Sequence, residues 1–132
     1  MVARRGAIDR LFAAGEVAEI LAALERDGAE NGPDEAFARM AAAQLRQKAP
    51  LSLKLTLALL RRGRNLDFDE CIRTEFRVAS RVAEGHDFYE GIRSVIIDKD
   101  QAPQWLPATL EAVAQHDVER HFAPIADELE LP

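Results

Sequence analysis

The residue types that most often carry catalysis are few in this chain, and their spacing does not bring them together. There is one cysteine, Cys71, and there are three histidines, His86, His116 and His121. A five-residue spacing places His116 and His121 on different sides of a helix, and although Asp117 can share a face with His121, a catalytic zinc needs three protein ligands. Cys71 falls on an apolar helical stripe, where a free cysteine packs as a small hydrophobe. We therefore predict a packing role for Cys71 and no metal site.

Hydroxyl nucleophiles and phosphate-binding loops are not indicated either. Ser52, Ser80 and Ser94 lie inside expected helices with no histidine–aspartate pair nearby, and the sequence contains neither a GxSxG turn nor a glycine-rich phosphate loop. The arginine run 61–64 can grip a phosphate, but it also ends an expected helix, where the negative carbonyl end favours cations. We favour the second interpretation. The sequence thus predicts that this chain holds no complete enzyme active site.

Two carboxylate pairs, Asp67 with Glu70 and Asp87 with Glu90, have the spacing of a capping box, which opens a helix. Paired acid–base carboxylates instead need environments that push their pKa values apart, and the sequence shows no such contrast. We therefore interpret all four as caps of helices that turn an apolar stripe inward. The predicted inward residues are Phe68, Cys71, Ile72, Phe76, Ala79, Val82 and Ala83 for the first helix, and Phe88, Ile92, Val95 and Ile96 for the second.

The elements that must position these residues begin with a helical hairpin. Apolar residues recur at helical spacing from Ile8 to Phe12 and again at 17, 20, 21 and 24. Gly28 is expected as a left-handed cap at the end of the second helix, and Pro33 in the first turn of the third. The inner face of that third helix is predicted to hold Phe37, Met40, Ala41 and Leu45.

Pro50 begins a second, longer block. Its first helix carries a strong stripe made of Leu51, Leu55, Ala58 and Leu59, and two capped helices follow. Val95–Ile97 is the one segment with strand character, and from Asp98 the chain is irregular, with short helical pieces near 109–113 and 117–122. The predicted fold class is all-α: a helical hairpin, a longer helical bundle and an irregular C-terminal tail. We expect one helical domain over 1–132, with 1–49 as a lead-in and 50–132 as the closing region.

Composition limits the function classes. The formal net charge is −6, so the chain lacks the basic face that neutralises phosphates, and we expect no nucleic-acid partner. No apolar run has the length of a bilayer span, and no leader is visible, so we expect a cytoplasmic protein without membrane contact. A single cysteine excludes an internal disulfide.

The segment 85–105 is less easily explained by packing and caps. A glycine inside a helix costs about 1 kcal/mol relative to alanine, so Gly91 suggests that another backbone or a ligand approaches closely. Lys99 stands between Asp98 and Asp100 at the end of an element. A polar surface turn is the simpler explanation of that charge pattern.

The same segment resembles the C-terminal region of the 3-hydroxyisobutyryl-CoA hydrolases, which belong to the enoyl-CoA hydratase/isomerase (crotonase) superfamily. The resemblance is carried by DFYEGIRSVIIDKDQAPQW, by PLSLKLTLALLRRG and FDECIRTEFRVASR before it, and by PATLEAV after it. IDRLFAAGEVAEILAALERDG looks like the helical lead-in to that region, so the resemblance covers nearly the whole chain.

This resemblance implies hydrolysis of a CoA thioester in valine breakdown, with no tightly bound cofactor. The oxyanion hole and catalytic carboxylates of such enzymes lie in an N-terminal core, so no catalytic residue is carried over and the chain alone is predicted to be inactive. Lys99 is the nearest match to a basic residue that approaches the CoA phosphates. The implied partner is an N-terminal crotonase-type core, or a second copy through the helical faces, and a free-standing non-catalytic interaction module is the alternative. If a core is missing, a set of stripe residues should be partly exposed: Leu51, Leu55, Phe76 and Val82.

Overall fold

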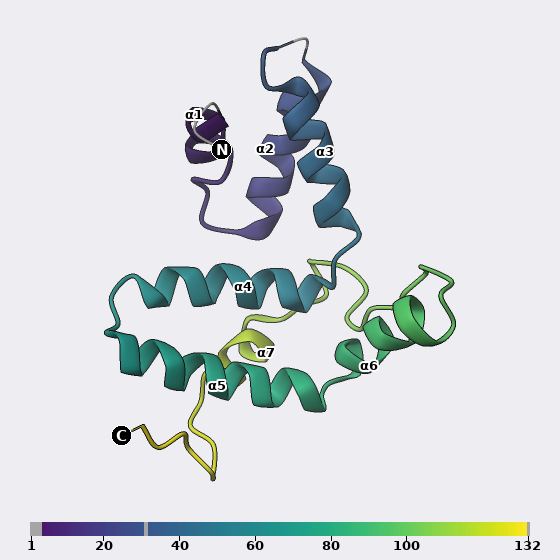
Figure 1. The fold of residues 1–132 in the computed structure, drawn as a ribbon. Helices are drawn as coiled ribbons and strands as arrows, with labels where there is room; N and C mark the ends of the chain where they lie inside the picture. The colour runs from purple at the N-terminus through teal and green to yellow at the C-terminus, as the bar shows by residue number, and fades with distance from the viewer. Residues whose placement is uncertain (1–3, 31, 132) are drawn as a thin grey trace. The chain divides into compact units, whose positions relative to one another are not determined.

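A computed structural model describes residues 4–30 and 32–131, and all regular structure within them is helical (Figure 1). The predicted all-α class is therefore confirmed. The structure divides into two compact units, Met1–Lys48 and Ala49–Pro132. The boundary lies beside Pro50, where the lead-in was expected to end, and the grouping of both parts into a single domain stays a prediction.

The first unit contains α1 (Arg5–Leu11), α2 (Val17–Ala29) and α3 (Glu35–Arg46). The helical stripe predicted for α2 is confirmed, because its apolar residues at 17, 20, 21 and 24 are all buried. The stripe predicted for α3 is displaced by one position. Ala38 and Ala42 are its buried residues, whereas Met40 is 48% exposed. Small side chains face α2 because the two helices pack closely.

Gly28 shows how close that approach is. It lies inside α2 and has a negative φ, so the predicted left-handed cap is wrong. A Cβ at position 28 would lie 3.1 Å from the backbone nitrogen of Arg39 on α3. Glycine is therefore required here by the helix crossing and not by a turn. Pro33 also lies outside α3, two residues before the first helical residue.

The second unit contains α4 (Pro50–Gly63), α5 (Phe68–Glu84), α6 (His86–Ile92), the π-helix η2 (Arg93–Ile97) and α7 (Gln115–Arg120). Helices α4 and α5 lie side by side and antiparallel, and α7 packs against α4 (Figure 1). The core of the unit combines the predicted α4 stripe with residues from α5 and α7. Its members are Leu55, Val78, Val113, Val118 and Phe122, with Leu51, Ala58, Leu59 and Val82 packed around them.

Helix α5 begins where the sequence predicted. Asp67 Oδ1 accepts a hydrogen bond of 2.9 Å from the Glu70 N–H, and Gly85 follows the last helical residue. The predicted inner face is only partly right, because Thr74 and Val78 are the buried residues of this helix. The two largest side chains of the predicted set are exposed, Phe68 to 77% and Phe76 to 37%.

The region after α5 departs most from the prediction. The tentative strand Val95–Ile97 is part of η2, and the helical piece expected at 109–113 is a series of turns. Three of the four apolar residues expected to continue a buried face are instead exposed, and Ser94 is the fully buried residue of η2. The exposed members of that set are Phe88, Val95 and Ile96.

Candidate functional site

The loop after η2 runs back across α6, and two carboxylates of α6 accept hydrogen bonds from its backbone. Asp87 Oδ1 accepts a hydrogen bond of 2.8 Å from the Leu106 N–H, and Glu90 Oε1 accepts one of 2.7 Å from the Gln104 N–H. The prediction that this pair forms a helix cap is therefore wrong. Because α5 ends at Glu84, the cap position of α6 falls on Gly85, and Asp87 already lies within the first turn.

Trp105 packs over the one glycine of α6. A Cβ at Gly91 would lie 3.6 Å from the Trp105 ring, which is an ordinary contact distance. His86 adds a second attachment, since its Nε2 lies 2.9 Å from the Gln104 carbonyl oxygen. The neighbour of Gly91 is thus the Trp105 side chain of the returning loop, at ordinary contact distance, and not the closely approaching backbone or ligand that the glycine suggested.

Arg93 holds the two ends of this loop together. Its guanidinium donates two hydrogen bonds to Glu90, at 2.9 and 2.8 Å, and one each to Asp98 at 2.7 Å and Asp100 at 2.6 Å. A further bond of 3.3 Å reaches the Ala102 carbonyl oxygen. We call Arg93, Glu90, Asp98 and Asp100 the Arg93 cluster. A planar guanidinium with five N–H donors suits such a set of acceptors.

The electrostatics of the Arg93 cluster follow from these bonds. Hydrogen bonding from Arg93, and then from the Gln104 N–H, lowers the pKa of Glu90 to about 2. Arg93 likewise lowers the pKa of Asp100, which also accepts a hydrogen bond from the Ala102 N–H. Hydrogen bonds to the three carboxylates raise the pKa of Arg93 itself, and the bonds to Glu90 contribute most. Glu90, Asp100 and Arg93 are therefore charged at neutral pH.

Lys99 lies at the tip of the loop that this cluster holds. Its φ is +56°, and that of Gln101 is +55°, which is a left-handed conformation that residues other than glycine seldom adopt. Both side chains are exposed. Asp98 and Asp100 face Arg93, and Lys99 has no hydrogen bond or ion pair within the described part of the chain.

The π-helix η2 supplies the turn that makes this geometry. The Asp98 N–H donates to the Arg93 carbonyl oxygen at 2.8 Å, five residues earlier. Single-turn π-helices are rare and frequently occur at functional sites.

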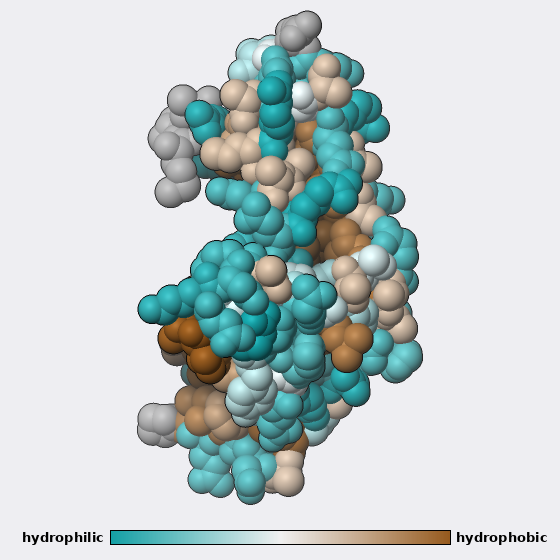
Figure 2. Space-filling model, turned by 90° about the vertical axis from the view of Figure 1, so that its right-hand side faces the viewer, coloured by the Kyte–Doolittle hydropathy of each residue, from teal (hydrophilic) through white to brown (hydrophobic). Residues whose placement is uncertain are grey.

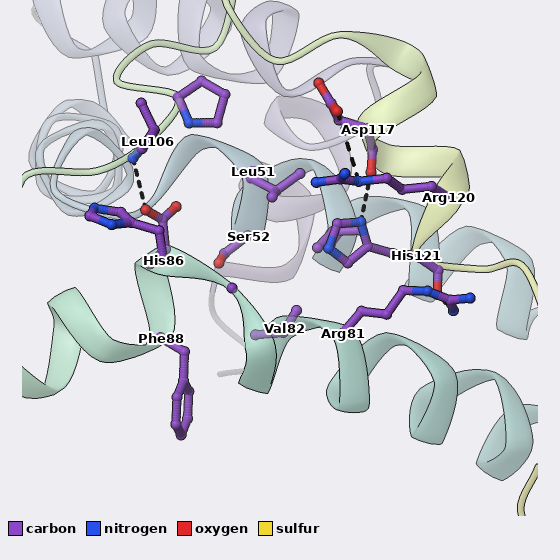
Figure 3. Close-up of a pocket in the computed structure, with 14 residues that line it drawn as sticks. Leu51, Ser52, Arg81, Val82, His86, Phe88, Leu106, Asp117, Arg120 and His121 are labelled. Carbon is purple, nitrogen blue, oxygen red and sulfur yellow. Dashed lines mark hydrogen bonds and ion pairs between the residues drawn. The ribbon is translucent and has the colours of Figure 1, made fainter. Parts of the chain in front are cut away.

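A pocket of about 340 Å³ lies between α4, α5, α6 and α7 (Figure 3). Figure 3 shows Leu51, Val82 and His121 turned toward its interior, while the ring of Phe88 points away. His121 is buried, and its Nδ1 lies 2.6 Å from the Asp117 carbonyl oxygen. Ser52 also lines the pocket.

The two ends of this pocket differ in how their charges are compensated. At one end, Arg81 donates to the carbonyl oxygens of His121, Ala123 and Pro124. At the other, Asp87 Oδ2 is buried without a hydrogen-bond partner. The arginine thus joins α5 to the segment after α7, and only the carboxylate oxygen stays unsatisfied.

The other candidates from the sequence have structural partners. Cys71 is half-buried, with its Sγ 3.7 Å from the Gly63 carbonyl oxygen. The guanidinium of Arg62 lies 3.8 Å from the centre of the Phe122 ring and 2.5 Å from a Glu119 oxygen. Arg62 thus attaches α7 to α4. Among residues 4–30 and 32–131, no three histidine, cysteine, aspartate or glutamate side chains are grouped to hold a metal ion.

Two apolar surfaces of the second unit are open. Figure 2 shows brown apolar patches exposed among hydrophilic residues. We define the η2 surface as Val95, Ile96 and Ile97, and the α5 surface as Phe68 and Phe76. Ile97 is 68% exposed, and each of the other four is at least 37% exposed. Of the stripe residues expected to be exposed, Leu51, Phe76 and Val82 are partly so, whereas Leu55 is buried.

Similar proteins align with most of this sequence. The chain is 43% identical over 125 residues to the mitochondrial 3-hydroxyisobutyryl-CoA hydrolase of Danio rerio, covering 95% of the chain and 31% of that protein. It is 38% identical over 115 residues to the human protein of the same name, covering 87% and 28%. It is also 38% identical over 135 residues to the small ribosomal subunit protein mS47 of Arabidopsis thaliana, covering 95% and 32%. The chain therefore spans about a third of the length of the curated relatives it matches.

Solved structures with the same fold are also known. A carnitinyl-CoA dehydratase from Mycobacterium thermoresistibile matches with a TM-score of 0.83 and 35% identity, over 98% of this chain and 35% of that one. An enoyl-CoA hydratase from Rhodobacter sphaeroides matches with a TM-score of 0.77 and 41% identity, over 94% and 35%.

The expected cytoplasmic localisation is contradicted by these relatives, because the names of the fish and human hydrolases place them in mitochondria. The chain matches only the C-terminal part of such proteins, so the start of its sequence carries no information on a targeting leader. No helix in the described ranges is both long and apolar enough to cross a bilayer.

The family itself is shown by a direct match. A family model described as enoyl-CoA hydratase/isomerase covers residues 1–122. This confirms the resemblance seen in the sequence, and the chain belongs to the enoyl-CoA hydratase/isomerase family, corresponding to the C-terminal part of its 3-hydroxyisobutyryl-CoA hydrolase members.

Proposed function

We propose that this chain is the helical closing part of a 3-hydroxyisobutyryl-CoA hydrolase, which hydrolyses a CoA thioester in valine catabolism. The chemistry is carried by a crotonase-type core that the 132 residues do not include. Thioester hydrolysis needs preorganised N–H donors for the developing oxyanion. In the part of the chain that the structure describes, no nucleophile, base and oxyanion donors lie together, so the chain alone is expected to be inactive.

The observation that carries the proposal is the exposed apolar area of the second unit. The α5 surface and the η2 surface present large side chains to solvent, and Phe68 is 77% exposed. Contiguous apolar patches on a soluble domain usually mark an interface. Since the hydrolase relatives are about three times as long as this chain, a core of matching chemistry accounts for them.

Lys99 is the proposed contact to coenzyme A. The proteins that resemble this chain carry different reactions in their names, namely hydrolysis, dehydration and hydration, and share coenzyme A. A C-terminal part that these proteins share can therefore serve all of them by contacting the phosphates of coenzyme A. The exposed ammonium of Lys99, held on an ordered loop, suits such a contact.

A chimera tests the proposal. The chain replaces the corresponding C-terminal third of the Danio rerio hydrolase, and hydrolysis of 3-hydroxyisobutyryl-CoA is measured. We expect turnover by the chimera, and none by the chain or by the truncated fish protein alone. The positive control is the fish hydrolase reassembled at the same junction. An inert chimera beside an active control contradicts the proposal, as does repurifiable turnover by the chain alone.

A second candidate is a non-catalytic assembly module. It is favoured by the 38% identity to a protein named as a ribosomal subunit component. Under this alternative the chain is a stable monomer whose apolar surfaces bind a partner other than a crotonase core. Sedimentation of the chain with and without the truncated fish hydrolase separates the two, because only the first proposal predicts a complex.

A further inference from the structure

The two aspartates beside Lys99 pair with Arg93 and not with the lysine. A lysine between two aspartates is expected to form an ion pair with one of them, which would reduce its attraction for an external anion. Here both aspartates are hydrogen-bonded to Arg93, at 2.7 and 2.6 Å. The charge of Lys99 is therefore not cancelled by its neighbours in sequence.

The backbone contributes to the same result. Positive φ angles at Lys99 and Gln101 are unfavourable for side chains with a Cβ, and they persist only where the surroundings impose them. Here Asp100 Oδ1 accepts from the Ala102 N–H at 2.9 Å, and Arg93 reaches the Ala102 carbonyl oxygen. Each left-handed residue thus adjoins a carboxylate that Arg93 fixes.

Glu90 fixes Arg93 in turn. Its carboxylate accepts two bonds from the guanidinium and one from the Gln104 N–H, and only 10% of its side chain is exposed. The guanidinium is therefore anchored on α6 before it reaches the loop. A lysine at position 93 has no planar fork and cannot bond all of these acceptors at once.

We propose that Arg93 is a positioning residue for anion binding: it withdraws Asp98 and Asp100 from Lys99 and holds the Lys99 ammonium free for a phosphate of coenzyme A. This rests on the proposed function, which assigns the phosphate contact to Lys99. Arg93 itself does not touch the ligand. Glu90 acts one step further back, by orienting Arg93.

The chain is well suited to a direct test, because it has only three lysines: Lys48, Lys54 and Lys99. Lysine ε-carbons labelled with ¹³C then give one resolvable signal each in the full 132-residue chain. The Lys54 ammonium donates to the Val113 carbonyl oxygen at 2.9 Å, so its signal reports folding of the second unit. Lys48 is exposed in the first unit and controls for unspecific attraction.

The first measurement needs no ligand. Backbone ¹⁵N relaxation of residues 98–101 is compared between the unaltered chain, Arg93→Gln and Arg73→Gln. Arg73 is the matched control, since it also pairs with a glutamate three residues earlier, at 2.8 Å from Glu70. We expect the loop to become mobile only in Arg93→Gln.

The second measurement adds coenzyme A. In the unaltered chain and in Arg73→Gln, the Lys99 signal should shift saturably while Lys48 does not. Arg93→Gln should weaken that binding about tenfold, because the charge-assisted contact of Lys99 with the phosphate is then lost. The Lys54 signal should stay unchanged. Arg93→Lys should restore part of the affinity and only part of the loop order.

The outcomes separate the two claims. If Lys99 responds no more than Lys48 in the unaltered chain, the proposed CoA contact is wrong and the inference falls with it. If Lys99 responds but Arg93→Gln changes neither loop order nor affinity, only the role of Arg93 is overturned. Should Arg93→Gln fail to fold, Arg93→Lys decides, because full affinity in a loop of unchanged order contradicts the need for a guanidinium.

Discussion

Two segments of this protein have nearly the same sequence and different structures. Residues 67–73 read DFDECIR and residues 87–93 read DFYEGIR. In the first, Asp67 caps helix α5 through the Glu70 N–H. In the second, Asp87 lies inside α6 and receives a backbone N–H from the returning loop. A local motif is thus compatible with two roles, and the rest of the chain selects one.

The two glutamate–arginine pairs differ in the same way. Glu70 and Arg73 form one ion pair at 2.8 Å, and 47% of the Glu70 side chain is exposed. Glu90 and Arg93 are joined by two bonds and take further partners from the loop, and Glu90 is 10% exposed. An exposed pair contributes little to stability, whereas a pair within a network can organise a loop.

The largest expected effect comes from removing the Trp105 ring, which packs over Gly91 in the second segment. Trp105→Ala should lower the free energy of unfolding by about 2 kcal/mol, below the usual loss for a fully buried tryptophan because Trp105 is half-buried. Urea unfolding followed by circular dichroism measures it. Hydrogen exchange should rise at 104–106 and stay unchanged at 70–73. Equal loosening of both segments contradicts the comparison.

The next effect distinguishes the glutamates by pH. The pKa of Glu90 is lowered from 4.5 to about 2 in the folded chain. Its contribution is therefore complete above pH 4.5 and is lost as the pH falls toward 2, because the unfolded state binds the proton first. Glu90→Gln should lower the free energy of unfolding at neutral pH. It should also reduce the fall of that free energy between pH 4.5 and 2. Glu70→Gln is the control, and an equal reduction by it argues against a special role for Glu90.

A smaller effect tests the two aspartates. Asp67→Ala should cost about 1 kcal/mol by removing the cap of α5, while Asp67→Asn should cost almost nothing, since asparagine also caps. Hydrogen exchange should increase in the first turn of α5. Asp87→Ala should instead increase exchange at Leu106 and leave the start of α6 protected. Fraying of α6 in that variant would show that Asp87 is a cap after all.

The smallest effect is a gain. A Cβ at Gly91 meets the Trp105 ring at an ordinary 3.6 Å, so Gly91→Ala should stabilise the second unit by about 0.5 kcal/mol through helix propensity. Unfolding in urea monitored by fluorescence of the single tryptophan measures this. Gly28→Ala is the opposite case, because its Cβ would lie 3.1 Å from the Arg39 backbone, and it should destabilise the first unit.

Much of the secondary structure could be read from the sequence. The stripe of α2, the start of α4 at Pro50 and the cap of α5 were predicted correctly, since each depends on residues within one or two turns of one another. The phase of α5 was missed because Phe68 and Phe76 mark an apolar surface that the described residues of the chain leave exposed. Hydrophobicity locates a surface that needs covering, but it does not say which element covers it.

Of the candidate site too, the sequence indicated the residues with a local signal and missed one without it. The sequence drew attention to Gly91 and to the lysine between two acids, because a helical glycine and a charge alternation are visible locally. It missed Arg93, whose importance arises from acceptors up to nine residues away that meet only when η2 turns the chain back. A regular α-helix continued through 93–97 would have separated these groups.

The sequence by itself determined that this chain is helical, where α4 and α5 begin, and to which family it belongs. Helices depend on hydrogen bonds four residues apart and on caps three residues apart, so a short stretch of sequence contains the information. Only the tertiary structure decided that the Asp87 and Glu90 carboxylates bind a returning loop and that Arg93 holds the aspartates beside Lys99. Those roles depend on which backbone N–H groups and side chains are brought together by packing, and local sequence does not specify them.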